Sequence, residues 1–291
     1  MKFNFIKQIN TLTHKFLEPR FQKKLKNLNL IFSFACLYIL FKFSNEFDFK
    51  ESFSNLTTTQ YIACSLFYFS NGLLWVSFMK KNFSIGLKEL INNWSYSKLG
   101  KYFPGSLMIF TVRLNQDIKD NENPRDILYG ILEEHFLTPI VAMATIGVSL
   151  FFYQYFTNIF IFIISSIFLF LFLRYFYLKI EFNFVSISSS AFIFLFHLNM
   201  NFLFFYSVAT TLEIENQYLF TLLYFLSSCF AIFFIGVPSG IGIRELFFYL
   251  LSMNLVSEDI FIDMAIKVRI LTISFDFFVG SIGLIRSNFK K

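Results

Sequence analysis

Apolar runs close to the length of a membrane crossing dominate this chain of 291 residues. They fall at about 28–44, 59–79, 137–156, 158–178, 187–209, 217–237 and 262–285. A helix of about 20 apolar residues crosses a hydrocarbon core about 30 Å thick, and it satisfies its own backbone polar groups there. Charged residues make up 15% of the chain, against about 25% in soluble domains. The sequence therefore predicts an all-α, polytopic integral membrane bundle.

Two further apolar segments, 94–115 and 239–256, are interrupted by helix-breaking residues. Pro104-Gly105 breaks the first segment and Pro238-Ser239-Gly240 breaks the second. Irregular backbone at membrane depth must be buried in protein or must line water. We expect about eight membrane helices, one of them discontinuous, and a re-entrant segment at 94–115. The 47 Phe residues mostly lack polar neighbours, so we expect most of them to face lipid.

The distribution of basic residues predicts the orientation of the bundle. Residues 1–29 contain seven Lys or Arg against one acidic residue, Glu18, which favours a cytoplasmic N-terminus. Alternating crossings then place the acidic loops 45–58, 210–216 and 257–261 outside. This holds if 94–115 dips and returns while 239–256 crosses, which puts the second break near the inner end of a span. The inside loops then hold Lys80, Lys81, Lys88, Lys98, Arg174, Lys179, Arg286, Lys290 and Lys291, and 116–134 is a loop on that side.

The chain divides into three predicted parts. Residues 1–27 form a basic cytoplasmic segment, which is either a short amphipathic helix on an anionic leaflet or an unstructured tail. Residues 28–286 form the transmembrane domain, and 287–291 form a basic cytoplasmic tail. No stretch is long enough for a separate soluble catalytic domain of about 100 residues. We therefore expect a multi-pass protein of the cell membrane whose N- and C-termini are both cytoplasmic.

The second break places an Arg–Glu pair inside apolar sequence, at Arg244 and Glu245. Intramembrane charges normally face a protein interior or a wet cavity, because they are costly in lipid. Pro238 should end one helix, Ser239 or Gly240 should cap the next, and Gly242 allows close backbone approach. A helix N-terminus there would attract phosphate or carboxylate, and Arg244 would add a forked donor. Glu245 either buffers that charge or pairs with a Lys or Arg from the first break.

Other polar residues in apolar segments have simpler interpretations. Arg269 and Asp276 share a helix face with Gly280 and Gly283. That face indicates either that Arg269 reaches the anion site, oriented by Asp276, or that a buried Arg–Asp pair accompanies a close helix contact through glycine. Lys267 is expected to snorkel toward an interface. The polar residues His197, Asn199 and Asn201 are expected to hydrogen-bond between helices.

The order of these motifs resembles that of a known family. Gly100-Lys101-Tyr102-Phe103-Pro104-Gly105 with Arg113, a carboxylate at Glu134, Pro238-Ser239-Gly240-Ile241-Gly242-Ile243-Arg244-Glu245, and then Ala265 and Arg269 resemble the lysylphosphatidylglycerol synthase transmembrane region, also called the flippase-like domain family. The resemblance covers about 95–285. It departs at Ser239, where glycine is common, and no aminoacyl-transferring domain follows Lys291, so synthesis of that lipid is not expected.

The resemblance implies a helical bundle that moves lipids between leaflets. We therefore expect a lipid or lipid-linked saccharide translocase rather than an enzyme, with the anionic headgroups of membrane lipids as its partners and nucleic acid excluded. No Walker motif is present to use ATP. The cysteines Cys36, Cys64 and Cys229 have no metal-site spacing, so no cofactor or metal is expected. The residues predicted to bind the headgroup are Lys101, Pro104, Gly105, Arg113, Glu134, Pro238, Gly240, Gly242, Arg244, Glu245 and Arg269.

Two alternative functions stay open. In the first alternative, the chain is a non-catalytic membrane partner of a glycosyltransferase or another lipid-modifying enzyme. A weaker hypothesis, a polyprenyl-sugar-dependent transferase, rests on Glu46-Phe47-Asp48 in the first external loop, where one class of glycosyltransferases places acidic metal ligands.

Overall fold

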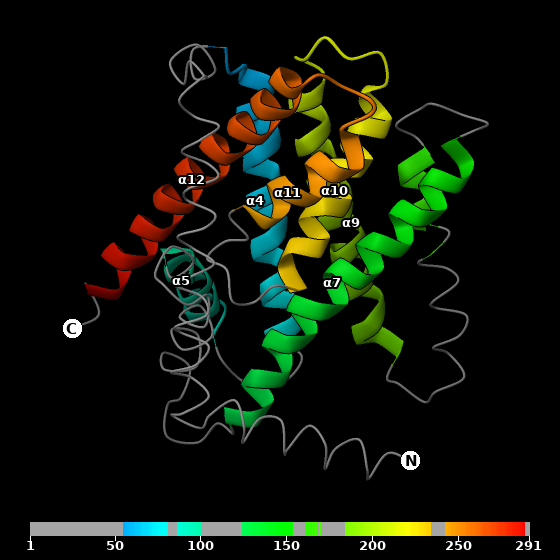
Figure 1. Cartoon of the computed structure of the whole chain (residues 1–291). Helices are drawn as coiled ribbons and strands as arrows, with labels where there is room; N and C mark the ends of the chain where they lie inside the picture. Colours follow the sequence, from blue (N-terminus) through cyan, green and yellow to red (C-terminus); the bar gives the residue numbers. More distant parts are fainter. Residues whose placement is uncertain are drawn as a thin grey trace, which may run out of the picture.

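The computed structural model describes residues 55–80, 86–99, 124–153, 161–167, 169, 184–233 and 242–288. Within these ranges the regular structure is helical and includes no strand, which confirms the all-α prediction (Figure 1). The helices are α4 (Thr58–Lys80), α5 (Leu87–Ser97), α7 (Pro124–Tyr153), α9 (Phe184–Ala209), α10 (Gln217–Phe233), α11 (Ile243–Ser252) and α12 (Glu258–Asn288). Residues 161–167 are also helical. The predicted basic segment 1–27, the first span and Glu46-Phe47-Asp48 lie outside the described residues.

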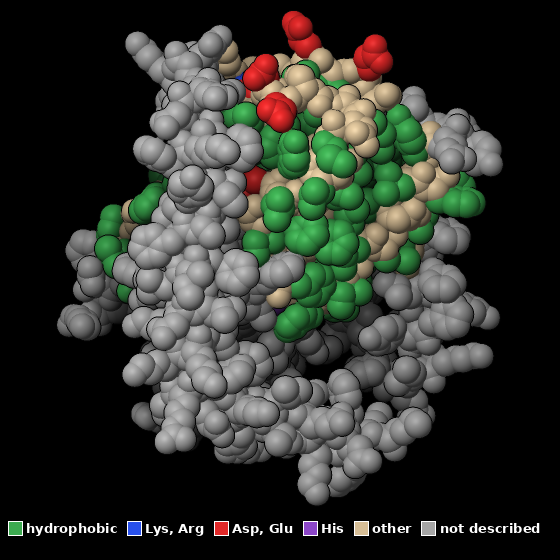
Figure 2. All heavy atoms as spheres, viewed as in Figure 1, with side chains coloured by type: hydrophobic (Ala, Val, Ile, Leu, Met, Phe, Trp, Pro, Cys, Tyr) green, Lys and Arg blue, Asp and Glu red, His purple; other side chains and the backbone are tan. Residues whose placement is uncertain are grey.

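Four of these helices are long and apolar enough to cross a membrane. The spanning stretches are Thr58–Met79, His135–Tyr153, Phe192–Ala209 and Glu258–Arg286, in α4, α7, α9 and α12. Large apolar side chains point away from the protein along them, for example Phe151, Phe192 and Phe278. Figure 2 shows apolar side chains covering much of one face of the molecule. The chain is therefore a membrane protein, as its composition predicts.

Helix α7 begins earlier than the sequence analysis predicts. Residues 116–134 were expected to form a loop, but α7 starts at Pro124 and continues through Glu134 into the apolar stretch. Pro124 is compatible with the first turn of a helix, where its missing N–H needs no partner. The polar first turns of α7 therefore continue the helix beyond its apolar part, a feature that hydropathy alone does not reveal.

Aromatic side chains fill the core between the helices. Phe162 and Phe202 stack with ring centroids 4.3 Å apart, and both side chains are buried. Further buried rings in the same cluster belong to Tyr68, Trp75, Phe204, Phe205, Phe220, Tyr224, Phe225, Phe248 and Phe261. The Phe residues of this cluster are exceptions to the expectation that most Phe residues face lipid. Apolar runs do not distinguish a lipid-facing ring from a core ring, because both environments favour the same side chain.

Helix α5 packs closely against the C-terminal half of α12. A Cβ built at Gly283 would lie 2.5 Å from the Tyr96 backbone nitrogen, and one at Gly280 would lie 2.5 Å from Leu99 Cγ. These positions therefore need glycine because the two helices approach each other so closely. The close helix contact through Gly280 and Gly283 that the sequence suggested is confirmed, as is typical of small residues at membrane helix interfaces. The Arg269–Asp276 pair that was expected with it is not found among the described residues, because Arg269 pairs with Glu245.

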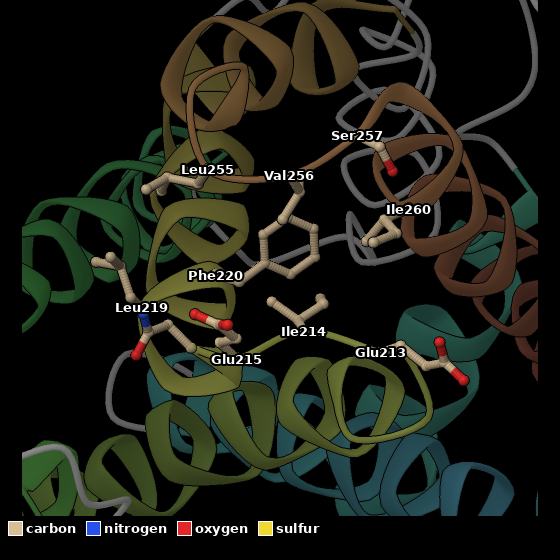
Figure 3. Close-up of a pocket in the computed structure, with 10 residues that line it drawn as sticks. Glu213, Ile214, Glu215, Leu219, Phe220, Leu255, Val256, Ser257 and Ile260 are labelled. Carbon is tan, nitrogen blue, oxygen red and sulfur yellow. The ribbon is translucent and has the colours of Figure 1, made fainter.

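Helices α10 and α11 form a hairpin with both outer ends on one side of the molecule. The turn 253–257 after α11 and the loop 213–216 before α10 line one pocket of about 300 Å³ (Figure 3). Exposed Glu213, Glu215, Glu258 and Asp259 lie at this side, which we call the acidic end. Figure 2 shows acidic side chains gathered there. Helix α12 begins at this end and slants along the side of the bundle toward the C-terminus (Figure 1).

Helix α11 is too short to cross a membrane by itself. It has 10 residues, which correspond to about 15 Å, whereas a crossing needs about 20 residues. Within the predicted segment 239–256, a helix begins after Gly242 and ends at Ser252, while the predicted break at Pro238-Ser239-Gly240 lies outside the described residues. The re-entrant prediction for 94–115 falls mostly on residues 100–115, which lie outside the described residues.

Candidate functional site

Gly242 marks the start of α11 with a backbone conformation that glycine tolerates best. Its φ is 83°, a positive value that L side chains rarely adopt. Its N–H donates a hydrogen bond to Glu245 Oε2 at 2.8 Å, while its carbonyl accepts one from Leu246 N at 2.8 Å. The helix cap is thus Gly242, not Ser239 or Gly240 as the sequence suggested. The Glu245 side chain satisfies the first N–H of the helix.

Glu245 also joins α11 to α12 through a forked ion pair. Arg269 Nε donates to Glu245 Oε1 at 2.7 Å, and Arg269 Nη2 donates to Glu245 Oε2 at 3.1 Å. Two parallel hydrogen bonds of this kind fix both the direction and the distance of the partners. Glu245 is 7% exposed, so this pair lies inside the protein. The partner of Glu245 therefore comes from α12, and Glu245, rather than Asp276, orients Arg269.

Arg244 adds a second guanidinium group beside the same carboxylate. Its Nε lies 3.5 Å from Glu245 Oε1, and its guanidinium carbon lies 5.2 Å from the centre of the Tyr224 ring on α10. The Arg244 side chain is 11% exposed. Its Nε and Nη2 atoms are buried and have no hydrogen-bond partner among the described residues. Its contact with Glu245 is therefore electrostatic, and the forked donor stays available.

The charges of this cluster do not cancel. Arg244 and Arg269 supply two positive charges and Glu245 supplies one negative charge, so these three side chains carry one positive charge in excess. The N-terminus of α11 adds about half a positive charge at the same place. Together with the free donor atoms of Arg244, this arrangement is suited to an anion.

The cluster lies within the bundle, well away from the acidic end. Along α11, ten residues separate it from the acidic end, which corresponds to about 15 Å. Arg269 lies eleven residues after Glu258, the first residue of α12, or about 16 Å along that helix. Half of a hydrocarbon core of about 30 Å is 15 Å. The sequence-based position of the break near the inner end of a span, which treats 239–256 as a full crossing, stays a prediction.

The structure brings together four of the residues that the sequence predicted for this site, namely Gly242, Arg244, Glu245 and Arg269. Glu134 lies in α7, but its side chain is outside the described parts. The other six predicted residues lie outside the described ranges: Lys101, Pro104, Gly105, Arg113, Pro238 and Gly240. Their contribution to the site stays a prediction.

Tyr224 belongs to the same cluster and was missed by sequence reasoning. It is fully buried on α10, and its ring lies under the Arg244 guanidinium. In the sequence it is one aromatic residue in a long apolar run, so no local signal distinguishes it. Its role depends on the packing of α10 against α11.

Two other buried cations differ from expectation. Lys267 does not snorkel: it is 4% exposed and its Nζ lies 2.7 Å from Asp263 Oδ2, one turn earlier on α12. Lys98 was assigned to an inside loop, but it is 5% exposed and donates to Asn71 Oδ1 at 2.7 Å. Its Nζ also lies 4.5 Å from the centre of the Trp94 ring. Both lysines are buried because polar or aromatic partners are close to their ammonium groups, from the same helix for Lys267 and from α4 and α5 for Lys98.

The expected hydrogen bonding between helices is confirmed for His197 and Asn199, but not for Asn201, whose buried Oδ1 has no hydrogen-bond partner among the described residues. Ser70 Oγ on α4 and His197 Nδ1 on α9 are 3.1 Å apart and buried. Asn199 Nδ2 donates to Ser166 Oγ at 3.1 Å, which connects α9 to the helix at 161–167.

The acidic-end pocket is a separate feature, with Phe220 and Ile214 facing its interior (Figure 3). It does not contain the Arg244 cluster.

In the described part of the chain, His, Cys, Asp and Glu side chains form no group of three or more that would suit a metal ion. Comparison with known proteins yields no matching family model, no matching curated protein and no matching solved structure. The functional interpretation therefore depends on the geometry of the cluster itself.

Proposed function

We propose that the protein is a translocase for a lipid or a lipid-linked saccharide, and that it binds an anionic headgroup at the N-terminus of α11. The observation that supports this proposal most strongly is the lack of hydrogen-bond partners for the Arg244 side chain. Two of its nitrogen atoms are buried without a hydrogen-bond partner among the described residues, in a cluster with one excess positive charge. Buried guanidinium nitrogen atoms without a hydrogen-bond partner carry a desolvation cost, and an anionic ligand would remove that cost.

The position of the cluster also fits transport. Half-length helices whose ends lie near the membrane midplane are typical of binding sites in transporters. Gly242 and the three charged side chains lie about 15 Å from the acidic end, where a headgroup would be roughly equidistant from both leaflets. The acyl chains would remain in lipid while the headgroup contacts Arg244. Arg269, held by Glu245, would add electrostatic attraction.

In this proposal the protein lies in the cell membrane with both termini on the cytoplasmic side, and the acidic end faces outward. The basic residues of the chain favour that orientation. Transport would be passive, coupled to an ion, or driven by removal of the lipid on the far side. Lys101 and Arg113 from the first break are proposed to bind the same headgroup. The resemblance of the motif order to the flippase-like domain family agrees with this cargo class.

The proposal is tested with purified protein in proteoliposomes that contain a fluorescent anionic lipid. Leaflet exchange is followed by adding a membrane-impermeant quencher. Arg244→Gln keeps a polar side chain but removes the charge, and we expect it to slow exchange at least tenfold, the effect of losing about 1.4 kcal/mol. Arg286→Gln is the matched control, because Arg286 is exposed near the end of α12.

Equal exchange rates in the parent and in Arg244→Gln would reject the role of Arg244. If the parent protein itself moves no lipid but purifies with a glycosyltransferase or lipid synthase, the non-catalytic partner function would replace translocation. An assay with a neutral fluorescent lipid distinguishes headgroup recognition from nonspecific leakage. We expect Arg244→Gln to leave any neutral-lipid exchange unchanged.

A further inference from the structure

The hydroxyl group of Tyr224 is buried beside the Arg244 guanidinium, but it makes no hydrogen bond of good geometry in the described structure. The Tyr224 side chain is 0% exposed. Its ring is held edge-on by Phe248, at 4.7 Å between centroids and an interplanar angle of 82°, and by Phe205, at 5.0 Å and 67°. Its hydroxyl has no hydrogen-bond partner within the described residues. The ring alone therefore accounts for the packing at this position.

A phenylalanine would fill the same space without a polar atom. A buried hydroxyl that lacks a partner carries a desolvation cost, and nearly all buried polar side-chain atoms in proteins have a partner. Tyr224 therefore has a polar atom that the surrounding aromatic core gives no reason to place there. A partner that is not part of the described chain explains it.

The neighbouring Arg244 side chain also lacks hydrogen-bond partners. The Arg244 guanidinium lies 5.2 Å from the Tyr224 ring centre, and its Nε and Nη2 also have no hydrogen-bond partner in the described structure. A guanidinium only donates hydrogen bonds, and a tyrosine hydroxyl donates readily. The nearby carboxylate of Glu245 is already occupied by Gly242 N–H and by two nitrogen atoms of Arg269. A single acceptor group with more than one oxygen would satisfy both residues.

We propose that Tyr224 is a ligand-binding residue, which donates its hydroxyl hydrogen to the same oxyanion that Arg244 binds. The inference rests on the proposed function and specifies it further. The ligand is a phosphate-type group, with one oxygen bound by Tyr224 and another by Arg244. A lipid headgroup and free phosphate share this chemistry. Tyr224 comes from α10 and Arg244 from α11, so the oxyanion also bridges the two arms of the hairpin.

Tyr224→Phe is a sensitive test because it removes one oxygen atom from a tightly packed ring. Binding is measured by isothermal titration of the purified full chain in detergent, with a short-chain phosphatidylglycerol in one arm and inorganic phosphate in the other. We expect about tenfold weaker binding of the ligand that occupies the site, as for loss of a hydrogen bond to a charged group. We expect the melting temperature without ligand to be unchanged or higher, since the hydroxyl has no partner to lose.

Tyr68→Phe serves as the matched control. The Tyr68 hydroxyl donates to the Thr272 carbonyl oxygen at 2.8 Å and connects α4 to α12. Its removal should lower the melting temperature and leave ligand affinity unchanged, the reverse of the Tyr224→Phe pattern. Tyr218→Phe is a second control on α10. Its hydroxyl also has no hydrogen-bond partner among the described residues, but Tyr218 lies six residues before Tyr224, toward the acidic end. We expect Tyr218→Phe to leave affinity unchanged.

The outcomes separate this inference from the proposed function. If Arg244→Gln weakens binding and Tyr224→Phe does not, the role of Tyr224 is wrong and that of Arg244 stands. If neither variant changes affinity, both are wrong. A lower melting temperature for Tyr224→Phe without ligand would reveal an internal partner and overturn the inference. Binding of inorganic phosphate alone, weakened by Tyr224→Phe, would support Tyr224 and contradict a lipid cargo.

Discussion

The α4–α9 contact and the α10–α11–α12 cluster both join helices inside the bundle, but they use different chemical groups. At the first, neutral groups meet: Ser70 Oγ and His197 Nδ1 are 3.1 Å apart, and Gln60 Nε2 donates to Thr211 Oγ1 at 3.0 Å. At the second, Glu245 meets two guanidinium groups. Both contacts hold helices together inside the bundle. Neutral hydrogen bonds are therefore sufficient for packing in this protein, and the charged cluster calls for another explanation.

The two contacts also differ in what they leave unsatisfied. The Ser70 hydroxyl donates to the Phe67 carbonyl oxygen at 2.7 Å and accepts from the His197 ring when Nδ1 carries the proton. Arg244, in contrast, keeps two nitrogen atoms without a hydrogen-bond partner among the described residues. In a contact that only stabilises the fold, the buried polar atoms are expected to have hydrogen-bond partners. The Arg244 cluster, in which two buried nitrogen atoms lack them, is therefore the better candidate for ligand binding.

The largest loss of stability is expected from Glu245→Gln. This change leaves two guanidinium groups facing each other without a counter-charge, so we expect the free energy of unfolding to fall by about 3–5 kcal/mol. The measurement is denaturant unfolding in mixed micelles. Glu213→Gln at the exposed acidic end is the control and should change stability little. A loss below about 1 kcal/mol for Glu245→Gln would indicate that water or lipid already compensates the cluster.

An intermediate effect is expected from Gly242→Ala, which tests the cap of the charged hairpin. The positive φ of 83° becomes strained once a Cβ is present, and we expect a loss of about 1–2 kcal/mol. Gly147→Ala is the matched control, because a Cβ at Gly147 on α7 meets nothing within 4 Å. It should be neutral or stabilising. Equal stability of both variants would show that the start of α11 relaxes to another conformation.

The smallest effect is expected from Ser70→Ala, which removes the neutral contact between α4 and α9. Hydrogen bonds between membrane helices average about 0.6 kcal/mol in double-mutant cycles, so we expect a loss of that size. Ser65→Ala is the control, because the exposed Ser65 hydroxyl bonds only within its own helix in the described structure. A cycle with His197→Phe isolates the pair. If Ser70→Ala lowered the free energy of unfolding as much as Glu245→Gln does, the neutral contact and the charged cluster would not differ in their contribution to stability.

Sequence reasoning predicted the elements better than their contacts. The apolar runs at 59–79, 187–209 and 262–285 match α4, α9 and α12, because hydropathy over about 20 residues is a local property. It also predicted that Arg244 and Glu245 lie at an interrupted helix. It did not predict that Gly242 is the cap, because a positive φ depends on the path of the chain into α11. It placed Lys98 in a loop because the aromatic partners of Lys98 lie on another helix or earlier on α5.

What the sequence determined by itself is the class of molecule: a membrane-embedded helical bundle that carries an Arg–Glu pair at a break in its apolar sequence. These properties depend on hydropathy and on Pro and Gly, whose effects act over a few residues. Tertiary structure alone decided that Glu245 pairs with Arg269, 24 residues away, and that Tyr224 lies beneath Arg244. Such contacts depend on how α10, α11 and α12 pack side by side. That packing is set by side-chain shape across several helices at once, and no local pattern in the chain encodes it.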